Sequence, residues 1–466
     1  MRFLAITTLG ALVAGSLCAE TRSAQPTFSR DVAPILYKHC AGCHHANDIA
    51  PMPLITYNDA KPWAAAIKEA VVTRKMPPWK ADPHYGKWSN DASLTDAEIA
   101  TLRQWADSGR LEGNPKNLPP APHFADGGWN IGEPDAIVKI PQQKLEGSGP
   151  DQYVYLKVPT GFTEDKWVVA AELRAGNRKV VHHAHVFVID PQAEAPEAKP
   201  KAGAAPASVN PTEAYARSLM VHEGSLSWLR PDAPVINDGC AVDDNGLVPG
   251  HKSNDLGTLI ASYLPGREPD IYPEGTARLI KAGSSLNFQI HYSRTTGKTE
   301  FDETSVGFIF AKEPPKKIAR RIDLSNQMFR IPANASEQQV TECHTFNKDM
   351  YITSLTPHMH LRGKAMEMIV TYPDGRSQTL LSVPHYDFNW QITYRAAQPI
   401  FIPKGTRIAV IGHFDNSRNN PLNPDPSKPV RWGAASETEM MDGWIEYVDA
   451  DSPPHPQSAE ARASMK

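Results

Sequence analysis

The spacing of apolar residues changes along the chain from a helical period to a strand period. Val32, Ile35 and Leu36 have the spacing of one face of a helix, which leads into a pair of cysteines. Residues 95–109 predict a second helix, because they open with the Thr-x-x-Glu spacing of a capping box and end on glycine. The two helices predict a small all-α domain at the start of the chain.

From Trp129 to about residue 450 the pattern consists of short alternating runs. Such alternation, bounded by turn residues, predicts strands with one buried face. The runs are "DAIVKI", "YVYLKV", "VVHHAHVFVI", "LNFQIHY", "SVGFIF", "EMIVTY" and "TRIAVIGHF". Prolines outnumber glycines by 42 to 30, which favours edge strands and turns over long helices. Many short strands with few helical patterns predict two antiparallel β-sandwich domains.

Changes in composition divide the 466 residues into three domains and their connections. "EGNPKNLPPAPHFADGG" is rich in Pro and Gly and predicts a linker, and "PQAEAPEAKPKAGAAPASVNP" predicts a mobile surface insertion. The expected units are a signal peptide at 1–24, a helical domain at 26–112, a linker at 113–133, a first β-sandwich at 134–312 with its insertion at 191–211, a second β-sandwich at 313–450 and a disordered tail at 451–466.

The N-terminus has the pattern of a secretory signal. Arg2 precedes an apolar stretch and small residues suited to cleavage near Ala19 or Ala24. The alternative is an uncleaved anchor, but the apolar run is too short to span a bilayer, and no later segment reaches about 18 consecutive apolar residues. We therefore expect a periplasmic or secreted protein without a transmembrane span. A formal net charge of −4 and no Lys/Arg block argue against nucleic acid as a partner.

The stretch "YKHCAGCHHAN" contains Cys40-Ala-Gly-Cys43-His44, the pattern that attaches a haem covalently. Two thiols at this spacing take up the haem vinyl groups, and His44 becomes the proximal iron ligand. With flanking helices and a methionine on the loop between them, residues 26–112 resemble a class I c-type cytochrome. The predicted second axial ligand is Met76, in "TRKMPPWKADP", and Met52 is the competitor. Half of a zinc site is the simpler alternative, but no second C-x-x-C is present.

Two further cysteines, Cys240 and Cys343, remain after the haem motif and the discarded signal segment. An oxidising compartment permits a disulfide between them, but the sequence alone leaves the pairing open.

Three strand-like segments carry histidines, in "VVHHAHVF", "QIHY" and "TPHMHL". In a strand, His358 and His360 point to the same face and so offer two nitrogens to a metal. Near the end of the chain, "ETEMMDGW" supplies Met440 and Met441. Imidazoles alone suit zinc, copper or iron, whereas an added thioether favours copper.

Residues 130–450 resemble the copper type II, ascorbate-dependent monooxygenases, the family of peptidylglycine and dopamine hydroxylases. The matching segments are "VVHHAHVF", "PEGTARLIKAGSSLNFQIHY", "TPHMHLRGK", "HYDFNWQ", "IPKGTRIAVIGHFDN" and "ETEMMDGW". The resemblance implies two jelly-roll-like domains that face each other across an open, solvent-filled cleft. It implies one copper on His182, His183 and His291, and a second copper, where O2 binds and hydroxylation occurs, on His358, His360 and Met440.

The first ligand set leaves one alternative open. Neighbouring residues of a strand point to opposite faces, so a pair formed by His183 and His185 would be simpler than one formed by His182 and His183. A strand end or a bulge can turn both His182 and His183 to one side, as the resemblance requires. His185 stays the alternative ligand.

The chain departs from the peptide-hydroxylating branch of this family at the substrate positions. That branch binds a carboxylate with an Arg two residues before the His-x-His and with Asn and Tyr after the ligand Met. Here those positions are Thr356, Asp442 and Trp444. The bidentate charged group is absent, so a glycine-extended peptide is not the expected substrate, and Trp444 favours an apolar or aromatic one.

Together the two resemblances predict an exported haem- and copper-dependent monooxygenase. It would hydroxylate a C–H bond of a small organic substrate with O2, and electrons from an upstream donor would pass from haem c to the His182/His183/His291 copper. A tethered haem supplies single electrons at high effective concentration. The alternative is a non-catalytic electron-transfer or copper-binding protein with a cytochrome c domain; a zinc- or carbohydrate-binding β-sandwich is a third hypothesis.

Overall fold

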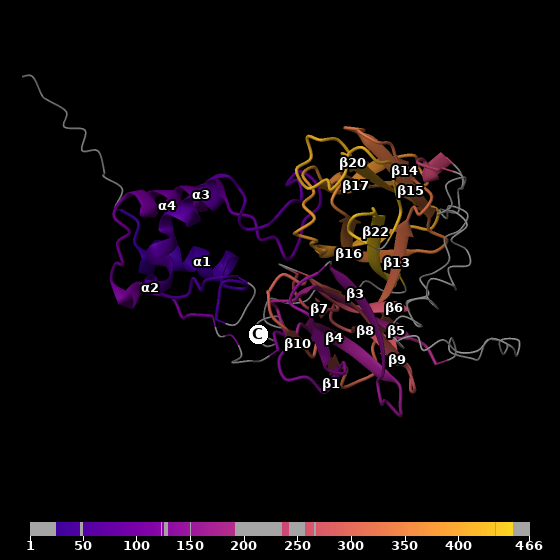
Figure 1. Ribbon diagram of the computed structural model, residues 1–466, viewed down its shortest axis with the longest axis horizontal. Helices are drawn as coiled ribbons and strands as arrows, with labels where there is room; N and C mark the ends of the chain where they lie inside the picture. Colours follow the sequence, from indigo (N-terminus) through magenta and orange to yellow (C-terminus); the bar gives the residue numbers. More distant parts are fainter. Residues whose placement is uncertain are drawn as a thin grey trace, which may run out of the picture.

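The computed structural model describes residues 25–46, 50–122, 124, 129–149, 151–191, 235–241, 257–264, 267–433 and 435–450 (Figure 1). The predicted signal peptide, all but the first residue of the predicted insertion and the predicted tail lie outside the described residues. Within the described part of the chain, none of the helices has both the length and the apolar character needed to cross a membrane.

The first part of the chain folds into short helices around a small apolar core. These are η1 (Phe28–Val32), α1 (Ala33–His39), α2 (Tyr57–Ala60), η2 (Lys61–Trp63), α3 (Ala64–Val72), α4 (Asp96–Asp107) and η3 (Pro115–Asn117). The predicted capping box is confirmed: the Thr95 side chain accepts from the Glu98 amide, and the Glu98 carboxylate accepts from the Thr95 amide. The fully buried Trp105 and Leu36 lie in the core of this helical segment.

The N-terminal sheets contain β1 to β12. Their strands are β1 (Ala136–Lys139), β2 (Gln143–Leu145), β3 (Gln152–Pro159), β4 (Lys166–Arg174), β5 (Val181–Ile189), β6 (Thr258–Tyr263), β7 (Asp270–Ile271), β8 (Thr276–Ile280), β9 (Ser285–Tyr292), β10 (Glu300–Asp302), β11 (Ser305–Phe310) and β12 (Lys317–Ile318). One sheet has the order β1-β11-β4-β8-β12, with β7 paired to β4; a second has the order β3-β9-β5-β6; and β10 pairs with β2. One apolar cluster includes residues of the two larger sheets, such as Phe308 and Phe288.

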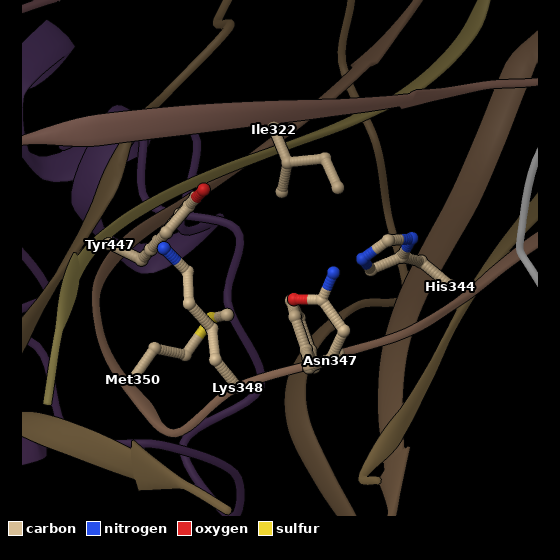
Figure 2. A pocket seen from close by; sticks show the side chains of 7 residues that line it. Ile322, His344, Asn347, Lys348, Met350 and Tyr447 are labelled. Atoms are coloured by element: carbon tan, nitrogen blue, oxygen red, sulfur yellow. The ribbon is translucent and has the colours of Figure 1, made fainter. Parts of the chain in front are cut away.

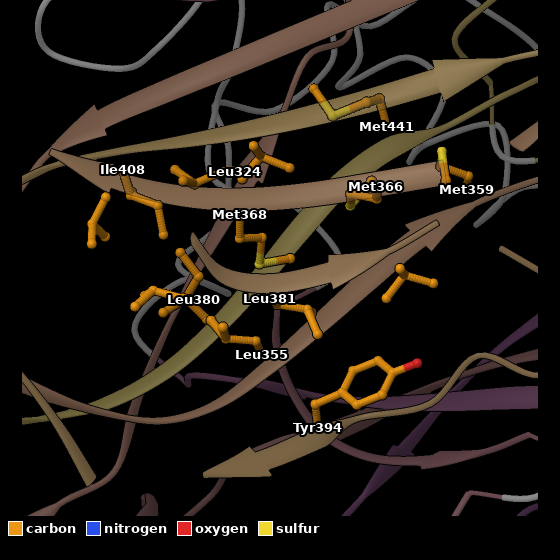
Figure 3. Packing of buried hydrophobic residues seen from close by; sticks show 14 of the residues in the cluster. Leu324, Leu355, Met359, Met366, Met368, Leu380, Leu381, Tyr394, Ile408 and Met441 are labelled. Atoms are coloured by element: carbon orange, nitrogen blue, oxygen red, sulfur yellow. The ribbon is translucent and has the colours of Figure 1, made fainter. Parts of the chain in front are cut away.

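The C-terminal sheets contain β13 to β22. Their strands are β13 (Arg320–Ser325), β14 (Arg330–Ile331), β15 (Gln338–Thr345), β16 (Met350–Met359), β17 (Gly363–Thr371), β18 (Ser377–Val383), β19 (Tyr394–Ile402), β20 (Arg407–Phe414), β21 (Val430–Arg431) and β22 (Met441–Asp449). The two larger sheets have the orders β13-β22-β16-β19 and β15-β20-β17-β18, and β14 pairs with β21. Methionines Met359, Met366, Met368 and Met441 fill much of their shared apolar core (Figure 3).

The fold class predicted from the sequence, a small all-α cytochrome c domain followed by two antiparallel jelly-roll-like β-sandwiches, is wrong. The described chain is mostly β, its helices are short, and most of its strands form four small sheets, one of six strands and three of four. Two contacts also cross the boundaries of the predicted units. Strand β12 lies beyond residue 312 yet pairs in parallel with β8 of the N-terminal sheets, and Trp88 from the predicted helical domain lies in the C-terminal core. Apolar period identifies strands, but it carries no information on which strands pair.

Candidate metal centre

Two polar sheet faces bring the predicted histidines together. In an antiparallel sheet, directly opposed residues share a face. On the sheet that contains β5, Tyr153 opposes His291, and His291 opposes His183. The opposite face of these strands carries apolar residues such as Ile290 and Ala184, which lie in the core. The alternation along β5 and β9 therefore places imidazoles on the polar face of this sheet.

A β-bulge explains how two adjacent histidines turn to one side. The register between β5 and β9 shifts between Val181 and His183, so His182 is the extra residue of the bulge. The Nδ1 atoms of His182 and His183 are 3.0 Å apart, and those of His183 and His291 are 3.4 Å apart. One ligand atom from each ring lies within 4.8 Å of the others, a spacing that a single metal ion can bridge. These are the three residues that the resemblance assigns to one copper, and that assignment stays a prediction.

The environment of this cluster favours neutral imidazoles, the form that binds metals. Burial lowers the pKa of His182, of His291 and, most strongly, of His183. The carboxylate of Asp151 lies 2.8 Å from Nε2 of His291 and orients that ring. Nδ1 of His291 thereby faces His183.

His185, the alternative ligand, lies on the same strand but outside the group of three. Its Nδ1 lies 2.9 Å from the hydroxyl of Ser262, so this nitrogen already has a partner. Its ring centroid is 5.6 Å from that of His183 and 6.3 Å from that of Trp444. The geometry therefore favours His182 over His185 as the third member of the cluster.

The second histidine pair lies at the end of β16. The ring centroids of His358 and His360 are 5.3 Å apart, and both residues are buried. Nδ1 of His358 lies 2.8 Å from Oε1 of Gln391, and Nδ1 of His360 lies 3.4 Å from the carbonyl oxygen of Thr438. Because both partners are acceptors, each Nδ1 carries the proton and each Nε2 presents a lone pair to a metal.

Met440 comes directly before β22, which pairs with β16. Met359 opposes Met441 as the last pair of this register, and His360 and Met440 are the next residues of the two chains beyond it. The carboxylate of Glu439 fixes this corner, because it accepts hydrogen bonds from the amides of His360, Arg362 and Met440. Burial raises the pKa of Glu439 to about 8.

Met441 points the other way. It is fully buried in the apolar core of the C-terminal sheets, beside Met359 (Figure 3). Met441 is therefore turned away from His358 and His360. Strand alternation continued by one residue would turn Met440 toward the histidines, and Met440 as a copper ligand stays a prediction.

The two histidine groups make contact through aromatic rings. The ring centroid of Phe388 is 6.3 Å from that of His182 and 5.9 Å from that of His360. Trp444 stacks on His358 at 4.9 Å and meets His185 edge-on at 6.3 Å. Rings of the N-terminal and C-terminal sheets thus lie in contact here, so the open, solvent-filled cleft expected between two domains is not seen at these described residues.

The predicted haem motif forms a turn after α1. The His44 amide donates to the carbonyl of Cys40 at 2.9 Å, and neither Cys40 nor Cys43 is in a disulfide. Nδ1 of His44 lies 3.1 Å from the carbonyl oxygen of Met52, which leaves Nε2 to face an iron, and burial lowers the pKa of the ring. The residues present therefore fit a haem on His44.

The same contact bears on the second axial ligand. The Met52 main chain lies on the Nδ1 side of His44, away from the nitrogen that would bind iron. Met76 follows α3, and its amide donates to the carbonyl of Ala70 at 3.1 Å. The position of the Met52 main chain argues for Met76, and Met76 as the second axial ligand stays a prediction.

The disulfide between Cys240 and Cys343 is confirmed. The two sulfurs are 2.05 Å apart, and they connect the short helix η5 (Gly239–Ala241) to β15. The sequence showed that this pairing was allowed in an exported protein but could not show that the two residues meet.

Sequence reasoning missed the residues that hold the histidines in place. Gln391 and Phe388 lie in "HYDFNWQ", a segment that carried the resemblance without a role for either side chain. Their contacts with His358 and His360 depend on tertiary packing, so no local pattern identifies them. A pocket of about 470 Å³ was also not predicted; it is lined by residues such as His344, Lys348 and Tyr447 and contains none of the predicted ligands (Figure 2).

Comparison with known proteins adds little at this point. No family model matches the chain, and no curated protein matches it. Among solved structures, PNGF-II in the P21 space group shares 11% identity over 69% of this chain, with a TM-score of 0.26, and this chain spans 66% of its length. The infectious bursal disease virus VP2 subviral particle shares 7% identity over 72% of this chain and 76% of that one, with a TM-score of 0.17. Scores this low carry no argument about fold or function.

The metal-free protein is expected to lose stability as the pH falls below about 6.5. Burial lowers the pKa values of His183, His185 and His360 well below 6.5 and that of His358 to about 4. Because the unfolded chain protonates these rings near pH 6.5, it binds more protons than the folded protein between that pH and about 4, and the free energy of unfolding falls. The slope reaches about 1.4 kcal/mol per pH unit for each imidazole.

Urea unfolding of the metal-free protein at a series of pH values between about 7.5 and 5 would measure this dependence. The variant His358→Gln, which cannot titrate, should show a smaller slope than the wild type. A free energy of unfolding that stays constant over this range would contradict the neutral, buried state of the four rings.

Proposed function

We propose that this protein is an exported haem- and copper-dependent monooxygenase that hydroxylates a C–H bond of a small organic substrate with O2. The observation that supports this most strongly is the meeting of two histidine groups of different composition. One consists of His182, His183 and His291, and the other of His358 and His360, to which the proposal adds Met440 from the chain directly before β22. A nitrogen-only site beside a site with a thioether would give two coppers of different redox character.

Each group has features of a prepared ligand set. Asp151 and Gln391 fix the orientation of His291 and His358, and Cys40, Cys43 and His44 would hold the haem. Phe388 has ring contacts with both histidine groups, to His182 at 6.3 Å and to His360 at 5.9 Å. When bound, the haem would supply single electrons and the coppers would supply the activation of O2. An upstream electron donor and a periplasmic or extracellular location complete the proposal.

The substrate is proposed to be apolar or aromatic and without a carboxylate anchor. Thr356 occupies the position of the family's carboxylate-binding Arg, and its hydroxyl is bonded to that of Thr393 at 2.9 Å. The indole of Trp444 stacks on His358, directly at the proposed hydroxylating group. The guanidinium of Arg321 lies over the same indole at 4.3 Å, so the support for an apolar substrate comes from the missing carboxylate anchor at position 356 and not from a free aromatic face.

A second candidate function is that of a non-catalytic electron-transfer or copper-binding protein. It is supported by the burial of His358 and His360, whose exposed fractions are 6% and 5%. A buried pair of ligands suits a carrier that keeps its metal away from O2. With such a carrier, the rate of O2 consumption would not change when organic compounds are added.

Metal analysis of the purified protein tests both the metals and their sites. We expect one iron and two coppers per chain in the wild type, and the variant Cys40→Ser/Cys43→Ser should lose covalent haem while keeping both coppers. The physical reason is that the thioether bonds need both thiols, whereas the copper ligands lie on separate sheets. Zinc in place of copper, or a haem-free wild type, would contradict the proposal.

Oxygen consumption separates the two candidate functions. The copper-loaded, reduced protein is screened against small apolar and aromatic compounds, with Met440→Ala as the matched control. Substrate-dependent O2 uptake that the control lacks supports the monooxygenase. Equal uptake by both proteins with every compound would favour the carrier.

A further inference from the structure

Residues 77–92 connect α3 to α4 but pack on the C-terminal sheets. We call this segment the strap. The amide of Asp82 donates to the carbonyl of Ser382 at 2.9 Å, and the amide of Ser89 donates to the carbonyl of Arg395 at 2.8 Å. The amide of Ala397 donates to the carbonyl of Lys87 at 2.8 Å. In Figure 1 the strap runs from the helices to the side of the sheets where β16 lies. The strap is therefore hydrogen-bonded along its length to β18 and β19.

Aromatic side chains anchor the strap. The indole of Trp79 meets the ring of Tyr394 edge-on at 5.0 Å, and that of Trp88 lies 5.5 Å from the same ring. Trp88 is 9% exposed and belongs to the apolar core of the C-terminal sheets. A buried tryptophan side chain removes a large apolar area from water and leaves a large cavity when it is lost. The strap is thus part of this core.

One strap residue reaches the strand that positions the second histidine pair. The side chain of Asn90 donates to the carbonyl of Thr393 at 2.8 Å and accepts from the amide of Arg395 at 3.0 Å. The hydroxyl of Thr393 is bonded to that of Thr356, two residues before His358. Gln391, two residues before Thr393, is the partner of His358 Nδ1. A short chain of contacts therefore leads from Asn90 to the His358 ring.

We infer that the strap is a positioning element: it docks the helical segment on β19 and sets the Gln391–Thr393 backbone that orients His358. Asn90 is the residue that joins the two tasks, since its two hydrogen bonds clamp the start of β19 from both sides of Tyr394. Met76 lies directly before the strap, so the strap also fixes the loop of that residue relative to the His358 and His360 pair. Only the description of these two ends as a haem ligand loop and a copper site rests on the proposed function.

The test uses the metal-free, haem-free protein with Asn90→Ala, Asn90→Asp and Asn117→Ala. Asn117 is an exposed asparagine of η3 and serves as the control. Hydrogen exchange reports the amide of Arg395, and the imidazole resonances of selectively labelled histidines report the His358 ring. We expect Asn90→Ala to speed exchange at Arg395 at least about tenfold and to shift the His358 signal. The His39 signal, from a ring in the helical segment, should stay in place.

The conservative variant makes the result specific. Asn90→Asp keeps an acceptor for the Arg395 amide, so protection there should return while the bond to Thr393 stays lost. If exchange rises but the His358 signal does not move, or if neither changes in Asn90→Ala, the positioning role is overturned. Neither readout needs a metal, so a protein without copper or iron would contradict the proposed function and leave this result standing.

Discussion

Replacing His183 by alanine is expected to leave the protein with one copper instead of two. His183 is the central ring of the cluster, since its Nδ1 lies 3.0 Å from that of His182 and 3.4 Å from that of His291. Without it, only two nitrogens remain. Mutation of a residue that only hydrogen-bonds to a metal ligand typically lowers metal affinity about 10- to 100-fold. Loss of a ligand itself should therefore weaken copper binding by more than about 100-fold.

Copper content after dialysis, together with the electron paramagnetic resonance spectrum of the oxidised protein, measures this loss. His185→Ala is the matched control, because His185 lies on the same face and its Nδ1 is already bonded to Ser262. It should retain two coppers. If His185→Ala loses copper and His182→Ala does not, the ligand set with His185 is correct and the one with His182 is wrong.

Local sequence patterns predicted the elements that depend on near neighbours. The capping box at Thr95 and Glu98 was found because both hydrogen bonds lie within one helical turn. The strand runs around His183, His291 and His358 were found because the period of two appears within each run. The same period predicted a common face for His358, in β16, and His360, directly after it, and their ring centroids are 5.3 Å apart.

Features that depend on pairing between distant segments could not be predicted in the same way. The bulge at His182 is visible only in the register of β5 against β9. The sequence alone did not decide on which face of the strand His182 lies. The hydrogen bonds of the strap go to residues about 300 positions later in the chain, in and next to β18 and β19, as between Asn90 and Thr393. Local sequence patterns therefore could not identify the strap. Contacts that cross the predicted unit boundaries, such as the pairing of β12 with β8, could not be predicted for the same reason.

The burial of the histidine groups has a physical cause that no single strand contains. The sheet β3-β9-β5-β6 and the sheet β13-β22-β16-β19 each have one apolar face in a core and one polar face. The two polar faces meet at Phe388 and Trp444. Ion pairs such as that between Arg278 of β8 and Glu446 of β22, at 3.0 Å, lie in the same region. Alternation alone would assign these faces to solvent. The open cleft was expected from the family resemblance, and neither source could show the ring contacts between the two groups of sheets.

The second large effect is expected from the disulfide. The variant Cys240→Ser/Cys343→Ser should lower the free energy of unfolding by about 4–5 kcal/mol, because the bond closes a loop of about 100 residues in the unfolded chain. The sequence separation of the two cysteines is 103. Closure of so long a loop restricts the unfolded ensemble more than that of a short one.

The native contacts around the disulfide should survive its removal. The amide of Thr341 donates to the carbonyl of Asn237 at 2.8 Å, and the hydroxyl of Thr341 donates to Asp238 at 2.7 Å. These bonds hold residues 235–241 against β15 without the sulfurs, so the loss should arise in the unfolded state. Urea denaturation of the variant beside the wild type measures the difference, with Thr341→Val as a variant that removes the hydroxyl contact but keeps the bond. A disulfide variant within about 1 kcal/mol of the wild type would show that the unfolded chain is already compact in this region, because residual structure reduces the entropy that a crosslink removes.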